Sequence, residues 1–138
     1  MSQRAFFDTN VLVYADDLDA GDKRLRARAL LHDALVANEG VLSTQVLQEF
    51  FVVATRKLGI EASMARRKVE LLSRMEVVAV RLDLILGAID LHRLHGISFW
   101  DGLIVKCAAA AGCKRLLTED LQHGQVIDGV RIENPFQS

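Results

Sequence analysis

Four acidic residues lie in sequence contexts where a carboxylate is unusual: Asp8, Glu49, Asp101 and Asp120. Asp8 and Asp120 each come shortly after an apolar run, and Glu49 and Asp101 lie in segments with helical periodicity, close to the apolar stripe. An ionised carboxylate in apolar surroundings costs several kcal/mol unless it is paired or bound to a metal. Each of these residues therefore needs a compensating partner.

Asp101 is the clearest case among the four. It lies in the predicted helix 99–111, where a rotation of about 100° per residue places its side chain beside Ile104 and Val105. Lys106 projects in nearly the opposite direction, toward water. The acid therefore shares the buried stripe of the helix, whereas the basic residue does not.

Each acid also has an ordinary structural interpretation. Asp101 is the third helical residue after a serine N-cap, where a carboxylate favours the helix dipole by roughly 0.3–1 kcal/mol. Asp8 fits a turn or an N-cap, and Asp120 fits a loop in which Glu119 could take its role. Glu49 lies only at the flank of its apolar stripe. Considered one at a time, the four positions leave these alternatives open.

Taken together, the four acids predict a metal site. Grouped carboxylates repel one another at neutral pH, and a hard divalent cation with oxygen ligands resolves that repulsion. Such a cation activates a bound water and neutralises charge on a phosphodiester, and two cations can bracket the attacking and leaving oxygens. The chemistry indicated is metal-assisted hydrolysis of a phosphoester.

Short apolar strands alternate with helices along the chain. Strands are predicted over 5–7, 41–42, 77–80, 115–118 and 130–132, and helices over 22–38, 45–58, 62–74, 83–95 and 99–111. This alternation is typical of a parallel sheet covered by helices, in which sites form beyond the carboxyl ends of the strands. Asp8 and Asp120 both follow a predicted strand and fall in that region.

Two of these elements carry specific expectations about burial. The continuous, mostly β-branched run Val77–Val80 predicts a strand covered on both faces. The helix over 22–38 is expected to begin with Asp22 as its N-cap and to bury the face that carries Leu25 and Leu30.

The composition is that of an ordinary globular protein. The chain has 138 residues, 51% hydrophobic and 25% charged, without a linker segment, so one domain over residues 1–138 is expected. A formal net charge of −1 argues against nucleic-acid binding through bulk positive charge. Basic clusters at 23–28, 56–57 and 66–68 fit either solvated helix faces or a phosphate-facing rim. No apolar run suits a membrane helix or a secretion signal, so a cytoplasmic location is expected.

The four acidic residues and the segments around them resemble those of the PIN-domain family and, within it, the VapC-type toxins of bacterial toxin–antitoxin pairs. The matching segments are Phe7-Asp8-Thr9-Asn10-Val11-Leu12, Thr44-Gln45-Val46-Leu47-Gln48-Glu49-Phe50, Ser98-Phe99-Trp100-Asp101-Gly102-Leu103-Ile104 and Leu117-Thr118-Glu119-Asp120-Leu121. Their order and spacing extend over nearly the whole chain. The opening Asp-Thr-Asn is weak alone, whereas four acids in the same order and context are fairly specific.

The resemblance implies a three-layer α/β/α domain around a parallel sheet of four or five strands. It implies a Mg²⁺- or Mn²⁺-dependent endoribonuclease, the toxin of a type II pair, which hydrolyses RNA through metal-activated water to leave a 5′-phosphate and a 3′-hydroxyl. The implied metal-binding and catalytic residues are Asp8, Glu49, Asp101 and Asp120. The residues implied to support them by hydrogen bonds are Thr9, Asn10 and Ser98. A homodimer and a cognate antitoxin that blocks the acidic cleft are implied as partners.

Other functions fit the sequence less well. A catalytically silent RNA- or protein-binding module of the same fold would be favoured by loss of one of these acidic residues, and all four are present. A receiver domain or a haloacid-dehalogenase-type phosphatase needs a second acid close to Asp8, which the following Thr-Asn does not supply. His92 and His95 have the wrong spacing for a helical zinc pair. Trp100 fits core packing or a base-stacking surface.

Overall fold

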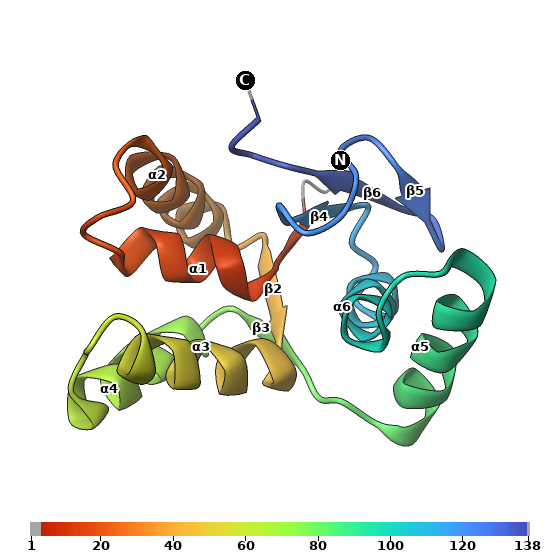
Figure 1. Cartoon of the computed structure of the whole chain (residues 1–138), viewed down its shortest axis with the longest axis horizontal. Coiled ribbons are helices and arrows are strands. Elements are labelled where there is room, and N and C mark those ends of the chain that lie inside the picture. Colours follow the sequence, from red (N-terminus) through yellow and green to blue (C-terminus); the bar gives the residue numbers. More distant parts are fainter. Residues whose placement is uncertain (1–3, 138) are drawn as a thin grey trace.

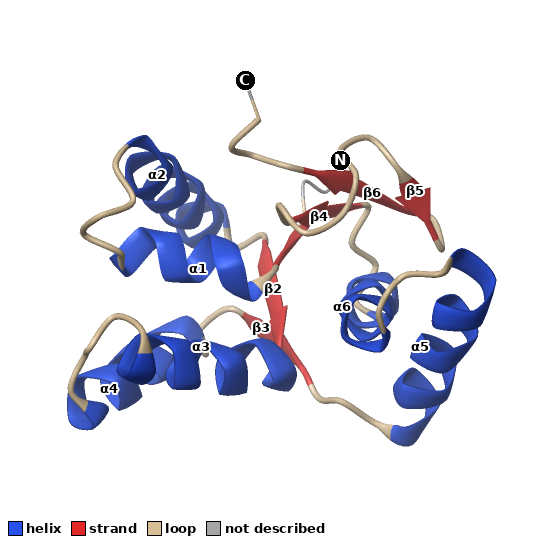
Figure 2. Cartoon of the chain, in the orientation of Figure 1, coloured by secondary structure: helices blue, strands red, loops and turns tan. Residues whose placement is uncertain are grey.

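The computed structural model describes residues 4–137, and six strands in this part of the chain form one sheet. In spatial order they are β3 (Glu76–Val78), β2 (Gly40–Ser43), β1 (Ala5–Phe7), β4 (Arg115–Leu117), β6 (Val130–Glu133) and β5 (Val126–Ile127). The first five strands in this order are parallel to one another, and β5 pairs with β6 in the antiparallel direction. Figure 2 shows this sheet at the centre, with helices on both sides.

The helices form two outer layers (Figure 1). One layer contains α1 (Thr9–Asp16), α2 (Asp22–Ala37), α3 (Thr44–Arg56) and α4 (Ala62–Leu72), and the other contains α6 (Phe99–Ala110) with α5 (Leu82–His95) outside it. The predicted three-layer α/β/α architecture is therefore confirmed, and the predicted parallel sheet of four or five strands corresponds to the five parallel strands, to which β5 adds an antiparallel edge. No helix between residues 4 and 137 combines the length and hydropathy that a bilayer crossing requires.

Helix α1 is absent from the elements that the sequence predicts. A turn is expected after the first strand, whereas the structure starts α1 at Thr9. Val11, Leu12, Val13 and Ala15 are all buried, so this helix of 8 residues is apolar on most of its circumference. A short helix whose polar face is as narrow as that of Asn10 and Tyr14 shows little of the periodicity by which helices are recognised in a sequence.

Two expectations about burial are wrong. Strand β3 lies at the edge of the sheet, with Glu76 exposed and its two valines only half-buried, because a continuous apolar run does not reveal which strand is central. In α2, Leu25 is 63% exposed and Ala27 is buried instead, although Leu30 packs against the core as expected. The N-cap of this helix is Gly21, and Asp22 is its first residue.

Strand β1 is the point at which the chain changes direction across the sheet. Strands β2 and β3 lie on one side of it, and β4 and β6 lie on the other. Ligand sites in open parallel sheets form at such a switch point, beyond the carboxyl ends of the strands. The Asp8 N–H donates to the Leu117 carbonyl at 3.0 Å, so the pairing of β1 with β4 continues to the first residue after β1. The acids that follow these two strands are thus brought to the switch point.

Candidate metal centre

Asp8 is the most buried acid of the predicted site, with 6% of its surface exposed. It is the N-cap of α1, where its Oδ1 accepts a hydrogen bond from the Thr9 backbone N–H at 2.7 Å. Its Oδ2 accepts a hydrogen bond from the Thr118 hydroxyl at 2.7 Å and another from Asn10 Nδ2 at 3.4 Å. The N-cap alternative is confirmed, and it leaves room for a metal because a carboxylate offers about four lone-pair sites.

Burial raises the pKa of Asp8 to about 7, and the charges of Asp120 and Glu49 raise it as well. The hydrogen bonds from Thr118 and Thr9 act in the opposite direction, because they favour the ionised form. The carboxylate is therefore held in place by donors but remains costly to ionise. A cation bound nearby would remove that cost and lower the pKa.

Asp101 lies in the first turn of α6 and is half-buried. Its backbone N–H donates to the hydroxyl of the N-cap Ser98 at 3.0 Å. The next residue, Gly102, brings α6 close to α5, because a Cβ there would lie 2.8 Å from the Ala88 carbonyl oxygen. Burial raises the pKa of Asp101, and the charge of Asp120 adds to this effect, whereas the Ser98 hydroxyl opposes it. The capping and buried-stripe interpretations of Asp101 both hold.

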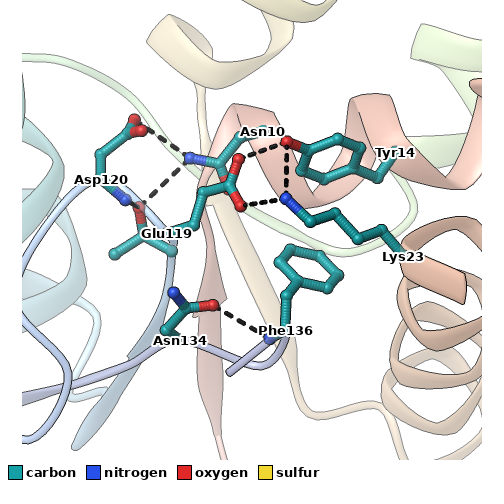
Figure 3. Close-up of polar contacts among 8 residues, drawn as sticks. Asn10, Tyr14, Lys23, Glu119, Asp120, Asn134 and Phe136 are labelled. Carbon is teal, nitrogen blue, oxygen red and sulfur yellow. Dashed lines mark hydrogen bonds and ion pairs between the residues drawn. The ribbon is translucent and has the colours of Figure 1, made fainter. Parts of the chain in front are cut away.

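Asp120 is exposed and lies on irregular backbone after β4. Its Oδ2 accepts a hydrogen bond from Asn10 Nδ2 at 3.0 Å (Figure 3), and its backbone N–H donates to Thr118 Oγ1 at 3.1 Å. The Asn10 amide also lies 3.3 Å from the Thr118 hydroxyl. One side chain of α1 therefore contacts the residues that follow both β1 and β4.

Asp8, Asp101 and Asp120 converge on one point. One carboxylate oxygen from each lies within 4.8 Å of the others. None of the three forms an ion pair with a lysine, arginine or histidine among residues 4–137. Three grouped carboxylates without a positive partner repel one another, and a divalent cation is the partner that their oxygens suit.

Glu49 lies beside this group rather than within it. Its Oε1 accepts hydrogen bonds from Gln45 Nε2 at 3.0 Å and from the Thr9 hydroxyl at 3.3 Å. Partial burial of the carboxylate raises the pKa of Glu49, and the charges of Asp120 and Asp101 raise it further. The fourth predicted acid is thus coupled to the cluster through its field, with its side chain anchored on α3 and α1.

Glu119 points away from the cluster. Its carboxylate accepts a hydrogen bond from the Tyr14 hydroxyl and forms an ion pair with Lys23 Nζ at 3.0 Å (Figure 3). The sequence leaves open whether Glu119 or Asp120 joins the other acids. The geometry brings Asp120 to Asp8 and Asp101.

Two residues of the site are missed by the sequence reasoning. Thr118 is fully buried, and its hydroxyl links Asp8 to the Asp120 backbone. Gln45 is buried on α3 and holds Glu49. The signals that point to them are a polar residue directly after a buried strand and an amide four residues before an acid on a helix.

The remaining candidates lie elsewhere. His92 and His95 are exposed, as expected of surface histidines, and His92 Nδ1 lies 2.6 Å from the Ile97 carbonyl oxygen. Both cysteines are buried and free, in surroundings that raise the pKa of each thiol to about 11. Trp100 is 62% exposed beside Asp101, which is contrary to core packing.

The polar atoms around the cluster fit a hydrated cation. Asn10 Oδ1 and Gln45 Oε1 are buried without a hydrogen-bond donor in the described part of the chain, although the nitrogen of each amide contacts an acid. Water bound to a cation supplies such donors. The three converging ligands are all carboxylates, without a thiolate or an imidazole among them, which suits Mg²⁺ or Mn²⁺ better than Zn²⁺.

Comparison with known proteins assigns this architecture to a family. The sequence model of the PIN-domain family matches residues 5–127, which is most of the chain. The chain belongs to the PIN-domain family. No curated protein matches it by sequence.

Solved structures that share the PIN fold with this chain include three from toxin–antitoxin systems. A toxin–antitoxin complex from Klebsiella pneumoniae aligns with a TM-score of 0.70 and 23% identity, over 97% of this chain and 99% of that chain. VapC20 of Mycobacterium tuberculosis, a toxin that cleaves the sarcin–ricin loop, has a TM-score of 0.67 and 21% identity, over 84% and 91%. VapBC2 of Rickettsia felis, bound to promoter DNA, has a TM-score of 0.64 and 22% identity, over 94% and 97%.

Proposed function

We propose that this PIN-domain protein is a metal-dependent endoribonuclease and the toxin of a type II toxin–antitoxin pair. The observation that carries the proposal is the convergence of Asp8, Asp101 and Asp120 without a basic partner in the described chain. Family membership and the likeness to toxin structures from three bacteria support the same assignment.

In this proposal, Asp8, Asp101 and Asp120 hold a Mg²⁺ or Mn²⁺ ion, and Glu49 binds through water. Such a cation, when bound, lowers the pKa of a water and neutralises charge on a phosphodiester. The protein's own contribution is rigid placement, because the donors on α1 and after β4 fix the orientation of the Asp8 and Asp120 carboxylates. Ser98 fixes the start of the helix that carries Asp101.

Water is the nucleophile that fits this cluster. The hydroxyls nearest to the acids are those of Thr9 and Thr118, which donate to Glu49 and Asp8. Both residues are buried, so neither hydroxyl is open to a phosphodiester. Hydrolysis by water is expected to leave a 5′-phosphate and a 3′-hydroxyl.

The partners proposed are RNA, a cognate antitoxin and a second copy of the chain, and the compartment proposed is the cytoplasm. The neighbouring structures support the proposal of an antitoxin, because two of them are toxin–antitoxin assemblies. Trp100 supplies an exposed aromatic face next to Asp101, where an unpaired base can stack. As the only tryptophan of the chain, it makes RNA binding measurable by its fluorescence in EDTA.

The deciding experiment is cleavage of total cellular RNA by the purified protein with Mg²⁺, with Mn²⁺ and with EDTA. Asp101→Asn is the informative variant, because it removes one negative charge of the cluster and preserves side-chain volume. Asp90→Asn is its matched control, since Asp90 lies on an exposed part of α5 and takes the same chemical change. We expect metal-dependent cutting by the wild type and by the control, and none by Asp101→Asn.

Two outcomes would contradict the proposal. Cleavage that persists in excess EDTA would exclude the metal role. Absence of cleavage by folded, antitoxin-free protein, combined with quenching of Trp100 fluorescence by RNA, would instead favour the catalytically silent RNA-binding module. Unfolding of Asp101→Asn would mean that its capping role dominates.

A further inference from the structure

The backbone that carries Asp120 has few regular contacts of its own. Residues 118–121 belong to neither a helix nor a strand. The Thr118 N–H still pairs with the Glu133 carbonyl at 3.1 Å, and the Asp120 N–H turns back to Thr118 Oγ1. An exposed acid on such a segment is not placed by secondary structure. Its position in the cluster therefore requires another anchor.

Glu119, which lies between Thr118 and Asp120 in the sequence, supplies that anchor through its side chain. The Asp120 side chain faces Asn10, whereas that of Glu119 faces Tyr14 and Lys23 (Figure 3). The Thr118 hydroxyl lies 3.3 Å from the Asn10 amide nitrogen, on the same side as Asp120. The Glu119 carboxylate uses one oxygen for the Tyr14 hydroxyl and the other for Lys23 Nζ. The segment is thus held from both of its sides.

A single face of α1 holds two consecutive residues of this segment. Asn10 and Tyr14 are four residues apart on α1, so their side chains project from the same side of the helix. Asn10 contacts Asp120, and Tyr14 contacts Glu119. Helix α1 also begins with Asp8 as its N-cap, so the same rigid element sets the positions of two acids of the cluster.

Lys23 of α2 and Phe136 near the end of the described chain support Glu119 from behind. Lys23 Nζ lies 4.8 Å from the centroid of the Tyr14 ring and 5.7 Å from that of Phe136, and the two rings meet edge-on with centroids 5.0 Å apart. The Phe136 N–H donates to Asn134 Oδ1 at 3.0 Å, which fixes this segment beside the rings. Rings on two sides restrict the ammonium group to the neighbourhood of Glu119.

We propose that Glu119, held by Tyr14 and Lys23, is a positioning residue that fixes Asp120 in the metal centre. This inference rests on the proposed metal site and adds residues that touch none of the three converging carboxylates. Loss of the anchor leaves the protein folded and lets Asp120 sample positions away from Asp8 and Asp101. The consequence is weaker metal binding, transmitted through Asp120 alone.

The test is Mn²⁺ binding measured by calorimetry without RNA, in the wild type, Tyr14→Phe, Asp120→Asn and the double variant. Tyr14→Phe keeps the ring contacts and removes only the hydroxyl that reaches Glu119. We expect it to weaken Mn²⁺ binding roughly 3- to 10-fold, less than the 10- to 100-fold typical of direct partners of metal ligands. In the Asp120→Asn background the same change should have no further effect, because the coupled residue is already lost.

Glu70→Gln is the matched control for Glu119→Gln, which removes the same charge at the anchor. Glu70 forms an exposed ion pair with Arg66 on α4, and its substitution should leave Mn²⁺ affinity unchanged. Lys23→Met, which retains an apolar stem between the rings, covers the case in which a Glu119 variant fails to fold.

The possible outcomes distinguish a failure of the proposed Glu119 anchor from a failure of the proposed metal centre. Wild-type affinity in Tyr14→Phe and Lys23→Met would overturn the anchor alone, as would an equal loss in the Asp120→Asn background. A wild-type protein that binds no Mn²⁺ would overturn both the anchor and the proposed metal centre.

Discussion

Asp8 and Asp120 follow adjacent parallel strands, yet their carboxylates differ in burial and in hydrogen bonding. Asp8 is buried, caps a helix and accepts hydrogen bonds from three groups. Asp120 is exposed on irregular backbone and accepts one hydrogen bond from a side chain, that of Asn10. The first carboxylate is fixed in place at a high cost of ionisation, whereas the second is in contact with solvent and depends on other residues for its position.

This difference teaches that a metal centre can divide its tasks among its ligands. A buried, pre-positioned acid gains most from a cation, because the cation replaces the solvation that the acid has lost. An exposed acid gains less, because it keeps its contact with water. The experiments that follow break or sharpen this contrast, from the largest expected effect to the smallest.

The largest effect concerns the pH dependence of the metal-free protein. The pKa of Asp8 is about 7 in the folded state and about 3.9 in an unfolded chain, so the folded state binds more protons between these values. The free energy of unfolding therefore falls as the pH rises through this window, by up to about 4 kcal/mol for the full shift. Urea unfolding in EDTA between pH 5 and pH 8 measures the upper part of this window, in which about 3 kcal/mol of the change falls.

Variants separate the two acids in the same measurement. Asp8→Asn should flatten the dependence on pH, whereas Asp120→Asn should keep most of it. Saturating Mg²⁺ should restore stability at pH 8 in the wild type, because ligand binding to the folded state adds to its stability. An unchanged slope in Asp8→Asn would show that another group causes the dependence.

Metal affinity should rank the two acids in the same order. We expect Asp8→Asn to weaken Mn²⁺ binding more than about 100-fold and Asp120→Asn by about 10- to 100-fold, because Asp120 is exposed and water can take the place of its carboxylate. Asp90→Asn serves again as the control. Equal losses at both positions would remove the contrast drawn above.

How far the sequence anticipates this site depends on the kind of residue. The strands and the helices with polar faces are predictable, because their apolar residues recur with a clear period. The acids are predictable from the conflict between their charge and their apolar context. Tyr14 and Thr118 are not, since a tyrosine and a threonine in apolar segments are ordinary residues until the fold directs their hydroxyls toward carboxylates.

Elements without a distinctive local pattern account for the failures. Helix α1 is apolar on nearly all sides, and β3 has an apolar sequence although it is an edge strand. Leu25 shows the converse, a large apolar residue exposed on a helix that buries an alanine. Tertiary packing decides these cases, and a single sequence does not contain that information in local form.

The hydroxyl of Thr118 is expected to make a smaller contribution than either acid. Thr118→Val keeps the volume of the side chain but removes the donor to Asp8, which leaves that carboxylate less well solvated. We expect a loss of about 1–2 kcal/mol in the free energy of unfolding at pH 8 in EDTA. Thr55→Val on α3, whose hydroxyl contacts only helix carbonyls, should cost less than about 0.5 kcal/mol.

The smallest effect is expected for Asn10→Ala. Its amide makes a good hydrogen bond to Asp120 and a long one to Asp8, so its loss should act mainly on the exposed acid. Mn²⁺ binding should weaken roughly 2- to 10-fold, which corresponds to one hydrogen bond of about 0.5–1.5 kcal/mol. A loss as large as that of Asp8→Asn would mean that Asn10 serves the buried acid instead.

The hydrogen bond from the Asp8 N–H to the Leu117 carbonyl has a consequence for how the site is retained as the sequence diverges. Parallel strands lie about 4.8 Å apart whatever their side chains are. The separation between the first acid and the segment that carries the last one is therefore a dimension of the peptide backbone. Substitutions in the core can accumulate without changing that dimension, as long as the two strands stay paired. A site whose spacing is set by strand pairing can be retained in proteins whose sequences have diverged widely.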